Sequence, residues 1–312
     1  MDKVIDTTRN GKPVPVAFRG VTNASNDDVR ANLVATFERG YSQEFSGLHD
    51  SVKGGVVSIV GSGPSLRWTY KDVTGDVFAC NSAHDFLIEH GIVPKWAMFW
   101  DVNPIIAKFI TKPHKDVRYL VASRCHPSVH EALKGYDVTI WHAAGDVIVE
   151  ELLQKYRRIS ASTGNIEPMV GGGSAGVTRA LYLAGYLGYE KIHLFGADSS
   201  YAEGETHVTG SLVDQQRLSL RICGKMFTLA PWMALQVGDF KLLVPQMQQA
   251  GVKFTVHGTG LIPHVATFLD CDTPDIKIGR FERVTRRVQS ALSVFFEVRN
   301  APQLLGGSNA GI

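Results

Sequence analysis

From about residue 55 onward, the chain alternates between short apolar runs and segments with helical spacing. Seven apolar runs, many of them β-branched, are typical of buried strands, at 56–60, 77–80, 97–100, 119–122, 138–141, 192–195 and 254–256. Helical spacing falls between them, at 83–90, 105–110, 128–133, 147–156 and 174–187. Strands that alternate with helices indicate βαβ units. We therefore expect an α/β fold with a mostly parallel, Rossmann-like sheet and helices on both faces.

The two ends of the chain depart from this pattern. Residues 1–54 are polar and weakly periodic, with helical spacing over 23–39. Near the other end, Arg280–Arg299 places apolar side chains at helical spacing among arginines, which predicts a basic amphipathic helix. We expect this helix to pack on the domain or on a second copy of the chain, as in a homo-oligomer. The pattern divides the chain into an N-terminal extension, a central α/β domain, and a C-terminal helix with a flexible tail, at 1–54, 55–268 and 269–312.

Composition narrows the class of protein. The chain has 312 residues, 44% hydrophobic and 20% charged, with a formal net charge of +2. These values are typical of a globular protein and do not favour a large nucleic-acid surface. No apolar run approaches the ~20 residues of a membrane span, and the first residues lack the apolar core of a signal peptide. We expect a cytoplasmic protein with free thiols, because its four cysteines are far apart, at Cys80, Cys125, Cys223 and Cys271.

A glycine turn follows the first predicted strand, in the order Gly61, Ser62, Gly63, Pro64, Ser65. Strand, tight turn and helix start together direct backbone N–H groups at one point, which suits a phosphate or another anion. Position 66 is Leu66, so the turn is not a dinucleotide fingerprint, and no Lys follows as in a P-loop. A tight turn with no ligand explains the same residues, so the turn alone leaves two interpretations open.

Glycine or polar residues also follow other predicted strands. Six strand ends carry them, at Gly61–Ser65, Asn81–Ser82, Asp101–Asn103, His142, Asp198–Ser200 and His257–Thr259. The carboxyl ends of parallel strands lie at one edge of a sheet, where ligands bind in such folds. We therefore expect these residues to share one cleft.

A set of short motifs, in a fixed order, resembles the 6-hydroxymethylpterin diphosphokinase (MptE)-like family over roughly residues 55–265. The motifs are Gly-Ser-Gly-Pro-Ser-Leu at 61–66, Ala-Cys-Asn-Ser at 79–82, the segment 95–104, Gly-Gly-Gly-Ser-Ala-Gly at 171–176, and the strand with its flanks at 188–198. That family includes the motility accessory factor proteins linked to flagellin glycosylation. The first turn and the Leu-x-Gly-x-Asp strand end are also similar to bacterial CMP-sialic-acid-dependent sialyltransferases. Tyr201–His207 resembles the Gly-x-x-His continuation of the family.

The resemblance implies a nucleotide-dependent transferase, and three functions stay open. The first is a glycosyltransferase with a CMP-sugar-like donor and a glycan or protein acceptor. The second is a Mg²⁺- and ATP-dependent diphosphokinase acting on a pterin-like alcohol, for which Arg124 or Lys225 would supply positive charge. The third is a non-catalytic nucleotide-binding scaffold. The central motifs hold no Lys- or Arg-rich clamp of the kind that phosphoryl transfer needs, which favours glycosyl transfer.

The resemblance also implies nucleotide contacts for particular residues. The first turn would hold the donor phosphates through backbone amides and the Ser65 hydroxyl. Side-chain amides and carboxylates at the next strand ends would bind phosphate, ribose or base. A second helix start would face the nucleotide from the opposite side. These positions are Gly61, Ser62, Gly63, Pro64 and Ser65, then Asn81, Asp101 and Asn103, then Gly172, Gly173 and Ser174.

The candidate catalytic residues are His207 and Asp198. An imidazole titrates near neutral pH and can transfer a proton to a phosphate or from a hydroxyl. Asp198 would act as a base, a ribose contact or a metal ligand. With Asp101 it would hold Mg²⁺ in the metal-dependent alternative, since this ion prefers oxygen ligands. His142 and His257, at other strand ends, are the next candidates for acid–base chemistry.

Overall fold

The computed structural model describes residues 24–210, 217–222 and 224–276, together with the backbone of five short strands outside these ranges. Those strands are β1 (Val4–Asp6), β2 (Thr8–Arg9), β3 (Lys12–Pro13), β4 (Val16–Phe18) and β15 (Phe296–Val298). The helix expected at 280–299 therefore lies outside the described residues, except that 296–298 form a strand. The tail from 299 onward also lies outside them.

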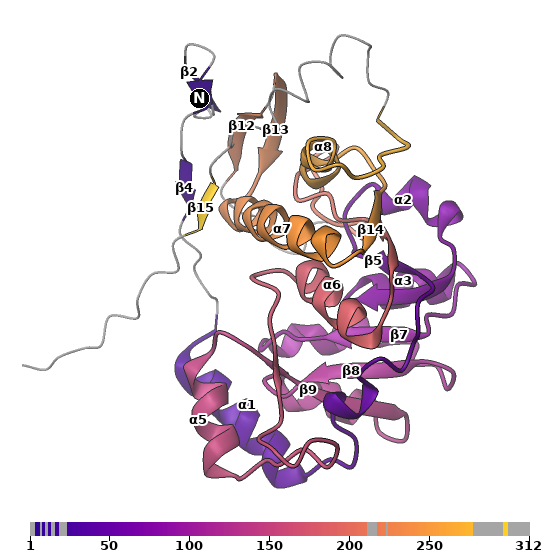
Figure 1. Ribbon diagram of the computed structural model, residues 1–312, viewed down its shortest axis with the longest axis vertical. Coiled ribbons are helices and arrows are strands. Elements are labelled where there is room, and N and C mark those ends of the chain that lie inside the picture. Colours follow the sequence, from indigo (N-terminus) through magenta and orange to yellow (C-terminus); the bar gives the residue numbers. More distant parts are fainter. Residues whose placement is uncertain are drawn as a thin grey trace, which may run out of the picture.

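An eight-stranded parallel sheet forms the centre of the molecule (Figure 1). All seven strands expected from the apolar runs are present, which confirms the parallel Rossmann-like architecture. The two-residue strand at 169–170 was not expected. In spatial order the strands are β10 (Met169–Val170), β9 (Asp137–Ala143), β8 (Arg118–Ala122), β7 (Trp96–Phe99), β6 (Asp76–Cys80), β5 (Val56–Val60), β11 (Lys191–Phe195) and β14 (Lys253–Val256).

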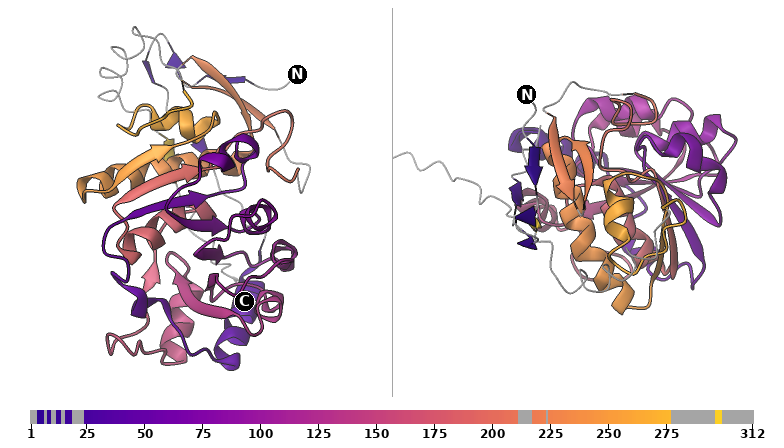
Figure 2. Two further views of the ribbon diagram at one scale, coloured as in Figure 1. Left: turned by 90° about the vertical axis from the view of Figure 1, so that its right-hand side faces the viewer. Right: turned by 90° about the horizontal axis from the view of Figure 1, so that it is seen from above.

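Helices cover both faces of this sheet (Figure 2). They are α1 (Asn26–Arg39), α2 (Leu66–Thr69), α3 (Ala83–Glu89), α4 (Pro127–Ala132), α5 (Val147–Lys155), α6 (Gly176–Leu187), α7 (Pro231–Gln249) and α8 (Leu261–Ala266). Three 3₁₀ helices add to them: η1 (Phe45–Leu48), η2 (Tyr70–Asp72) and η3 (Pro104–Phe109). The hairpin β12 (Leu218–Ile222) and β13 (Lys225–Leu229) and the helices α7 and α8 were not expected. In the described part of the chain, no helix combines the length and the apolar character needed to cross a bilayer.

The inner strands are buried on both faces, which explains why they consist of continuous apolar runs. Val57, Ile59 and Phe78 are fully buried among the residues of the main core. A smaller apolar cluster joins α1 to α5, with Leu33 and Phe37 packed near Leu152. Through this cluster the helix expected at 23–39 packs beside the sheet.

The chain reverses its direction across the sheet at β5. From β5 it proceeds through β6, β7, β8 and β9 to β10, and then returns through α6 to place β11 on the free side of β5. The two strands pair in register, with Val60 beside Phe195. Ligands of open parallel sheets bind beyond the strand ends at such a reversal.

Candidate functional site

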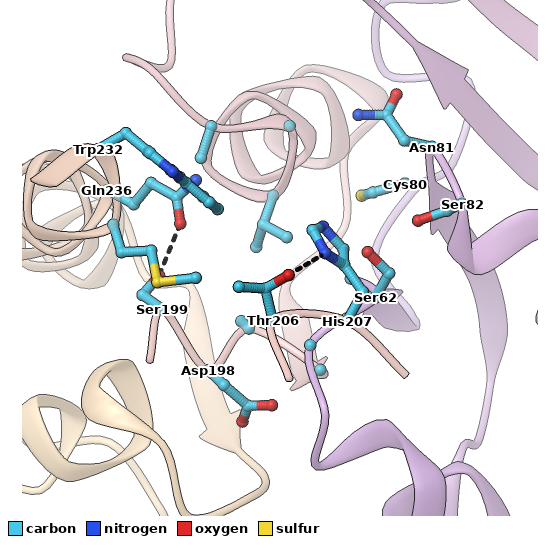
Figure 3. Close-up of a pocket in the computed structure, with 18 of the residues that line it drawn as sticks. Ser62, Cys80, Asn81, Ser82, Asp198, Ser199, Thr206, His207, Trp232 and Gln236 are labelled. Atoms are coloured by element: carbon cyan, nitrogen blue, oxygen red, sulfur yellow. Dashed lines mark hydrogen bonds between the residues drawn. The ribbon is translucent and has the colours of Figure 1, made fainter. Parts of the chain in front are cut away.

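A cavity of about 340 Å³ opens beyond the carboxyl ends of β5, β6, β7 and β11 (Figure 3). We call it the main cavity. Its walls also include the start of α6, the first turns of α7, and Ser199, Thr206 and His207 after β11. Eight of the residues proposed from the sequence line it: Gly61, Ser62, Gly63, Asn81, Asp101, Asn103, Asp198 and His207. Four of the six strand ends expected to share one cleft therefore meet at the strand reversal, whereas those at His142 and at His257–Thr259 do not.

The glycine turn after β5 is occupied by the protein itself. The amide of Gly63 donates to Gly196 O at 2.7 Å, and that of Ser65 donates to Asp198 Oδ2 at 2.7 Å. A Cβ on Gly63 would lie 2.5 Å from Asp198 Oδ2, so glycine is needed for the approach of the β11 end. Pro64 and Ser65 do not line the main cavity. The amides of Gly61, Gly63 and Ser65 thus have acceptors within the protein, and the phosphate contact expected at this turn stays a prediction.

The start of α6 offers free amides in place of that turn. Ala175 precedes the helix with extended backbone and makes no side-chain capping hydrogen bond. Ala175, Gly176, Val177 and Thr178 all line the main cavity. The first amides of a helix have no partner within it and carry the positive end of the helix dipole. This twelve-residue helix therefore directs uncapped donors into the cavity.

The residues just before α6 face elsewhere. Ser174 donates through both N and Oγ to Asp239 Oδ2, each at 2.6 Å. A Cβ on Gly173 would meet the same carboxyl group, and one on Gly172 would lie 2.5 Å from Arg179 Cα. None of the three lines the main cavity. The four residues that follow, 175–178, line the main cavity instead, because Asp239 on α7 holds the loop 172–174. The nucleotide contact expected at 172–174 stays a prediction.

Asn81 combines a left-handed backbone with an unpaired buried side-chain atom. Its backbone has a φ of 49°, although it is not glycine, at the end of β6. Its Oδ1 atom is buried and has no hydrogen-bond partner among the described residues. Strained backbone and an unpaired buried polar atom are typical of a binding site. The Nδ2 atom lies 3.3 Å from the Cβ position of Gly176, beside the α6 amides.

Asp101 and Asn103 form a polar corner of the main cavity. Asp101 Oδ1 accepts from the amide of Asn103 at 3.0 Å, and Asn103 Oδ1 accepts from the amide of Ile105 at 3.0 Å. These bonds cap η3 and fix the loop. Asp101 keeps its second carboxylate oxygen and an exposed side chain for a ligand.

His207 points into the main cavity from the segment that follows β11 (Figure 3). Its Nδ1 lies 2.8 Å from Thr206 Oγ1. Burial lowers the pKa of the imidazole below its ordinary value, so the ring is neutral at pH 7. A neutral imidazole in a ligand cavity can accept a proton.

The other two histidine candidates are part of the packing. His142 Nε2 lies 2.6 Å from Glu167 Oε2, and both side chains are buried. His257 stacks on Phe195 with ring centroids 4.1 Å apart. Neither residue lines the main cavity.

The carboxylates of this cavity do not fit a magnesium site built by the protein. Asp198 lies at the floor of the cavity, and its carboxyl group points away from Thr206 and His207 (Figure 3). Burial raises its pKa, which favours the protonated form over a metal ligand. Among the described residues, no three His, Cys, Asp or Glu side chains come together as a metal site requires. Arg124, one of the suggested cations, pairs with Asp146 at 3.1 Å instead.

Two side chains of the main cavity come from α7 and were missed in the sequence. Trp232 and Gln236 both extend into the cavity from this helix (Figure 3). Gln236 Oε1 accepts from Ser199 Oγ at 2.8 Å, and Ser199 has a φ of 46°. This bond leaves the amide nitrogen of Gln236 as the group that faces a ligand. The proline at the helix start, Pro231, is the one signal that would have located them.

Comparisons with known proteins agree with this architecture. The structure of a MAf glycosyltransferase from Magnetospirillum magneticum AMB-1 matches 85% of this chain, with a TM-score of 0.53 and 15% sequence identity. The chain spans 41% of that longer protein, and at this identity the likeness shows the fold alone. A search of curated proteins gave no match. The model of one family, described as 6-hydroxymethylpterin diphosphokinase MptE-like, matches residues 31–204, more than half of the sequence. The chain belongs to the MptE-like family.

Proposed function

We propose that this protein is a nucleotide-dependent transferase that binds a nucleotide-sugar donor, of the CMP-sugar type, in the main cavity. The observation that carries the proposal is the uncapped start of α6, which lies in one cavity with Asn81 and His207. The family and the glycosyltransferase named for the structural neighbour support a transferase. The cavity volume of about 340 Å³ is within the range of small-ligand sites.

The walls of the cavity suggest how the donor lies. The phosphate binds the α6 amides, where an anion is favoured. The base lies at the α7 end, stacked near Trp232, with the Gln236 amide donating to a carbonyl or ring nitrogen of the base. The transferred sugar then reaches the opposite end, where Asn81, Ser82 and Asp101 offer polar contacts.

Glycosyl transfer needs one base and one stabilised leaving group in this cavity. The acceptor oxygen forms a bond to the anomeric carbon, while the bond from that carbon to the donor phosphate breaks. The electron pair leaves with the phosphate, whose charge the α6 dipole stabilises. The proton of the acceptor hydroxyl passes to the neutral imidazole of His207.

The alternative is diphosphate transfer from ATP, which the description of the family favours. Such a reaction concentrates negative charge that Lys, Arg and Mg²⁺ normally stabilise. The described residues that line the main cavity include no Lys or Arg. Glycosyl transfer needs less positive charge in the cavity, and it is therefore the function that we favour. A nucleotide-binding scaffold without activity is the third candidate.

Calorimetry with CMP, UMP, AMP, GMP and ATP, each with and without Mg²⁺, tests the proposal. We expect CMP to bind without metal, and Gln236→Ala to weaken it by about three- to tenfold, the size expected of one hydrogen bond. Gln246→Ala, on an exposed position of the same helix, is the matched control and should change nothing. Binding of ATP alone, and only with Mg²⁺, would favour the diphosphokinase. If none of these nucleotides binds, the proposed function would be contradicted, and the nucleotide-binding scaffold with it.

A further inference from the structure

Another cavity, also of about 340 Å³, lies on the far side of Asp198 from the main cavity. We call it the Trp68 pocket and define it by Ser65, Trp68, Asp198, Tyr201, Lys225 and Met226. Gly260 also lines it, as do the residues 225–228 of the hairpin strand β13. Asp198 lines both cavities, so the two lie next to each other.

The segment 199–208 separates the two cavities. Tyr201 and Ala202 line the Trp68 pocket, whereas Thr206 and His207 line the main cavity. The segment is tied down on both sides, since the Tyr201 amide donates to Thr228 O at 2.7 Å and that of Val208 donates to Ser62 O at 2.7 Å. One short wall therefore holds the candidate base on one side and the Trp68 pocket on the other.

Two buried polar atoms of the Trp68 pocket have no partner among the described residues. They are Ser65 Oγ and Asp198 Oδ1, in residues that are 2% and 3% exposed. Both lie near Gly258, whose Cβ position is 2.4 Å from Ser65 Oγ and 3.1 Å from Asp198 Oδ1. Unpaired buried groups are costly unless a ligand or a bound water completes them. A hydroxyl group, which both donates and accepts, matches this pair.

The mouth of the pocket adds one charge and an apolar surface. Lys225 Nζ lies 3.3 Å from Thr259 O and, among the described residues, has no carboxylate partner. The side chains of Trp68 and Met226 are unusually accessible for their type, with 48% and 41% exposed. An aromatic face, a cation and a buried hydroxyl-binding pair together suit a ring compound that carries hydroxyls and a negative charge.

We infer that the Trp68 pocket is an accessory site, outside the donor cavity, for a small hydroxylated ring compound with an anionic group, such as an acidic sugar. The inference goes beyond the proposed function, because the segment 199–208 lies between this pocket and the main cavity. A hydroxyl of the ligand bonds to Asp198 Oδ1 and Ser65 Oγ. The anionic group pairs with Lys225, and the ring lies against Trp68.

A charge series of sugars tests this pocket in the full chain. Binding of glucuronate, glucose and glucosamine is measured by ligand-observed NMR, first without and then with CMP. We expect glucuronate to bind most tightly, glucose less tightly and glucosamine most weakly. Lys225→Gln should reduce the preference for glucuronate over glucose by about two- to fivefold, the size of an exposed ion pair. Trp68→Ala should weaken all three sugars.

Two controls distinguish an effect on the Trp68 pocket from an effect on folding or on the donor site. Lys253→Gln removes an exposed lysine at the start of β14 and should leave the order of binding unchanged. CMP affinity should be the same in Lys225→Gln as in the unaltered chain. Equal binding of the three sugars, no sugar binding up to millimolar concentrations, or an unchanged preference in Lys225→Gln would overturn the inference. Loss of CMP binding in the unaltered chain would instead count against the proposed function, whatever the sugars do.

Discussion

At the scale of single residues, the contact between the β5 turn and Asp198 organises the floor of both cavities. Gly63 has no space for a side chain, because its Cβ position lies 2.5 Å from Asp198 Oδ2 and 2.6 Å from Gly196 O. The carboxyl group in turn accepts the Ser65 amide at the start of α2. Glycine at this position is therefore a requirement of packing.

Gly63→Ala tests this assignment. We expect it to lower the free energy of unfolding by about 1–3 kcal/mol in urea without any nucleotide, as overpacking does. Gly47→Ala is the control, since its Cβ position has no heavy atom within 4 Å. If Gly63→Ala unfolded like the unaltered chain and lost only nucleotide binding, the turn would be a phosphate site after all.

The same residues show what a sequence can and cannot specify at this scale. Asn81, Asp101 and His207 come together in the main cavity because strand ends share one edge of a parallel sheet, which the apolar pattern predicts. The partner of Gly63 is set by the register of β11, which depends on contacts 133 residues apart, as between Ser65 and Asp198. A local motif carries no information about such a partner, so the contact of the glycine turn with Asp198 cannot be predicted from the motif alone.

At the scale of elements, α6 combines an uncapped start with a position facing the main cavity. Ala175 already has the extended backbone of a capping residue, at φ −114° and ψ 148°. Capping by Asp stabilises a helix by about 1 kcal/mol relative to Ala. The helix thus forgoes this stability at the point where a ligand anion would bind.

Ala175→Asp should therefore raise the stability of the fold and lower its affinity for the ligand. We expect the free energy of unfolding to rise by about 1 kcal/mol, because the new carboxylate caps the α6 amides. Calorimetry should show CMP binding at least about tenfold weaker, since the phosphate loses its donors and meets a like charge. Ala175→Asn, a neutral cap, should give a similar gain in stability and a smaller loss of affinity. Unchanged CMP affinity in Ala175→Asp would place the phosphate elsewhere.

Elements differ in how well the sequence reveals them. The inner strands were predicted because burial on both faces requires apolar runs, as at Val56–Val60. Helix α7 was not predicted, because its sequence shows no clear polar face. The helix is apolar around much of its surface and contains Pro245. The same omission hid Trp232 and Gln236, and with them one wall of the main cavity.

At the scale of the whole molecule, several half-buried histidines link stability to pH. Burial lowers the pKa of His130, His193, His207 and His257, which lie in different parts of the fold. For His130 the value falls to about 4, with burial as the main cause and the Arg39 charge as a further one. Its Nε2 lies 3.3 Å from Thr36 Oγ1, so this histidine joins α1 to α4.

The sign of the effect follows from where the proton binds. The unfolded chain takes up a proton at each histidine near pH 6.5, whereas the folded chain resists protonation until the lowered pKa is reached. Stability is therefore fully present above pH 6.5 and is lost as the pH falls. For His130 the loss between pH 7.5 and pH 5 amounts to up to about 2 kcal/mol. The pKa of Asp198 is raised, so this residue changes stability with pH in the opposite direction. The effect of one histidine must therefore be measured as a difference between a variant and the unaltered chain.

His130→Gln isolates the contribution of one histidine. Urea unfolding at pH 7.5 and at pH 5 should show a smaller loss of stability in the variant than in the unaltered chain, by up to about 2 kcal/mol. Carboxyl groups with lowered pKa, such as those of Asp76 and Glu167, titrate below this window and cancel in the difference. His49→Gln, at a histidine whose side chain is 61% exposed, is the control and should follow the unaltered chain. The prediction is contradicted if stability falls equally with pH in His130→Gln and in the unaltered chain. Such a result would mean that α1 and α4 separate before His130 is protonated, and that burial of this histidine does not make stability depend on pH.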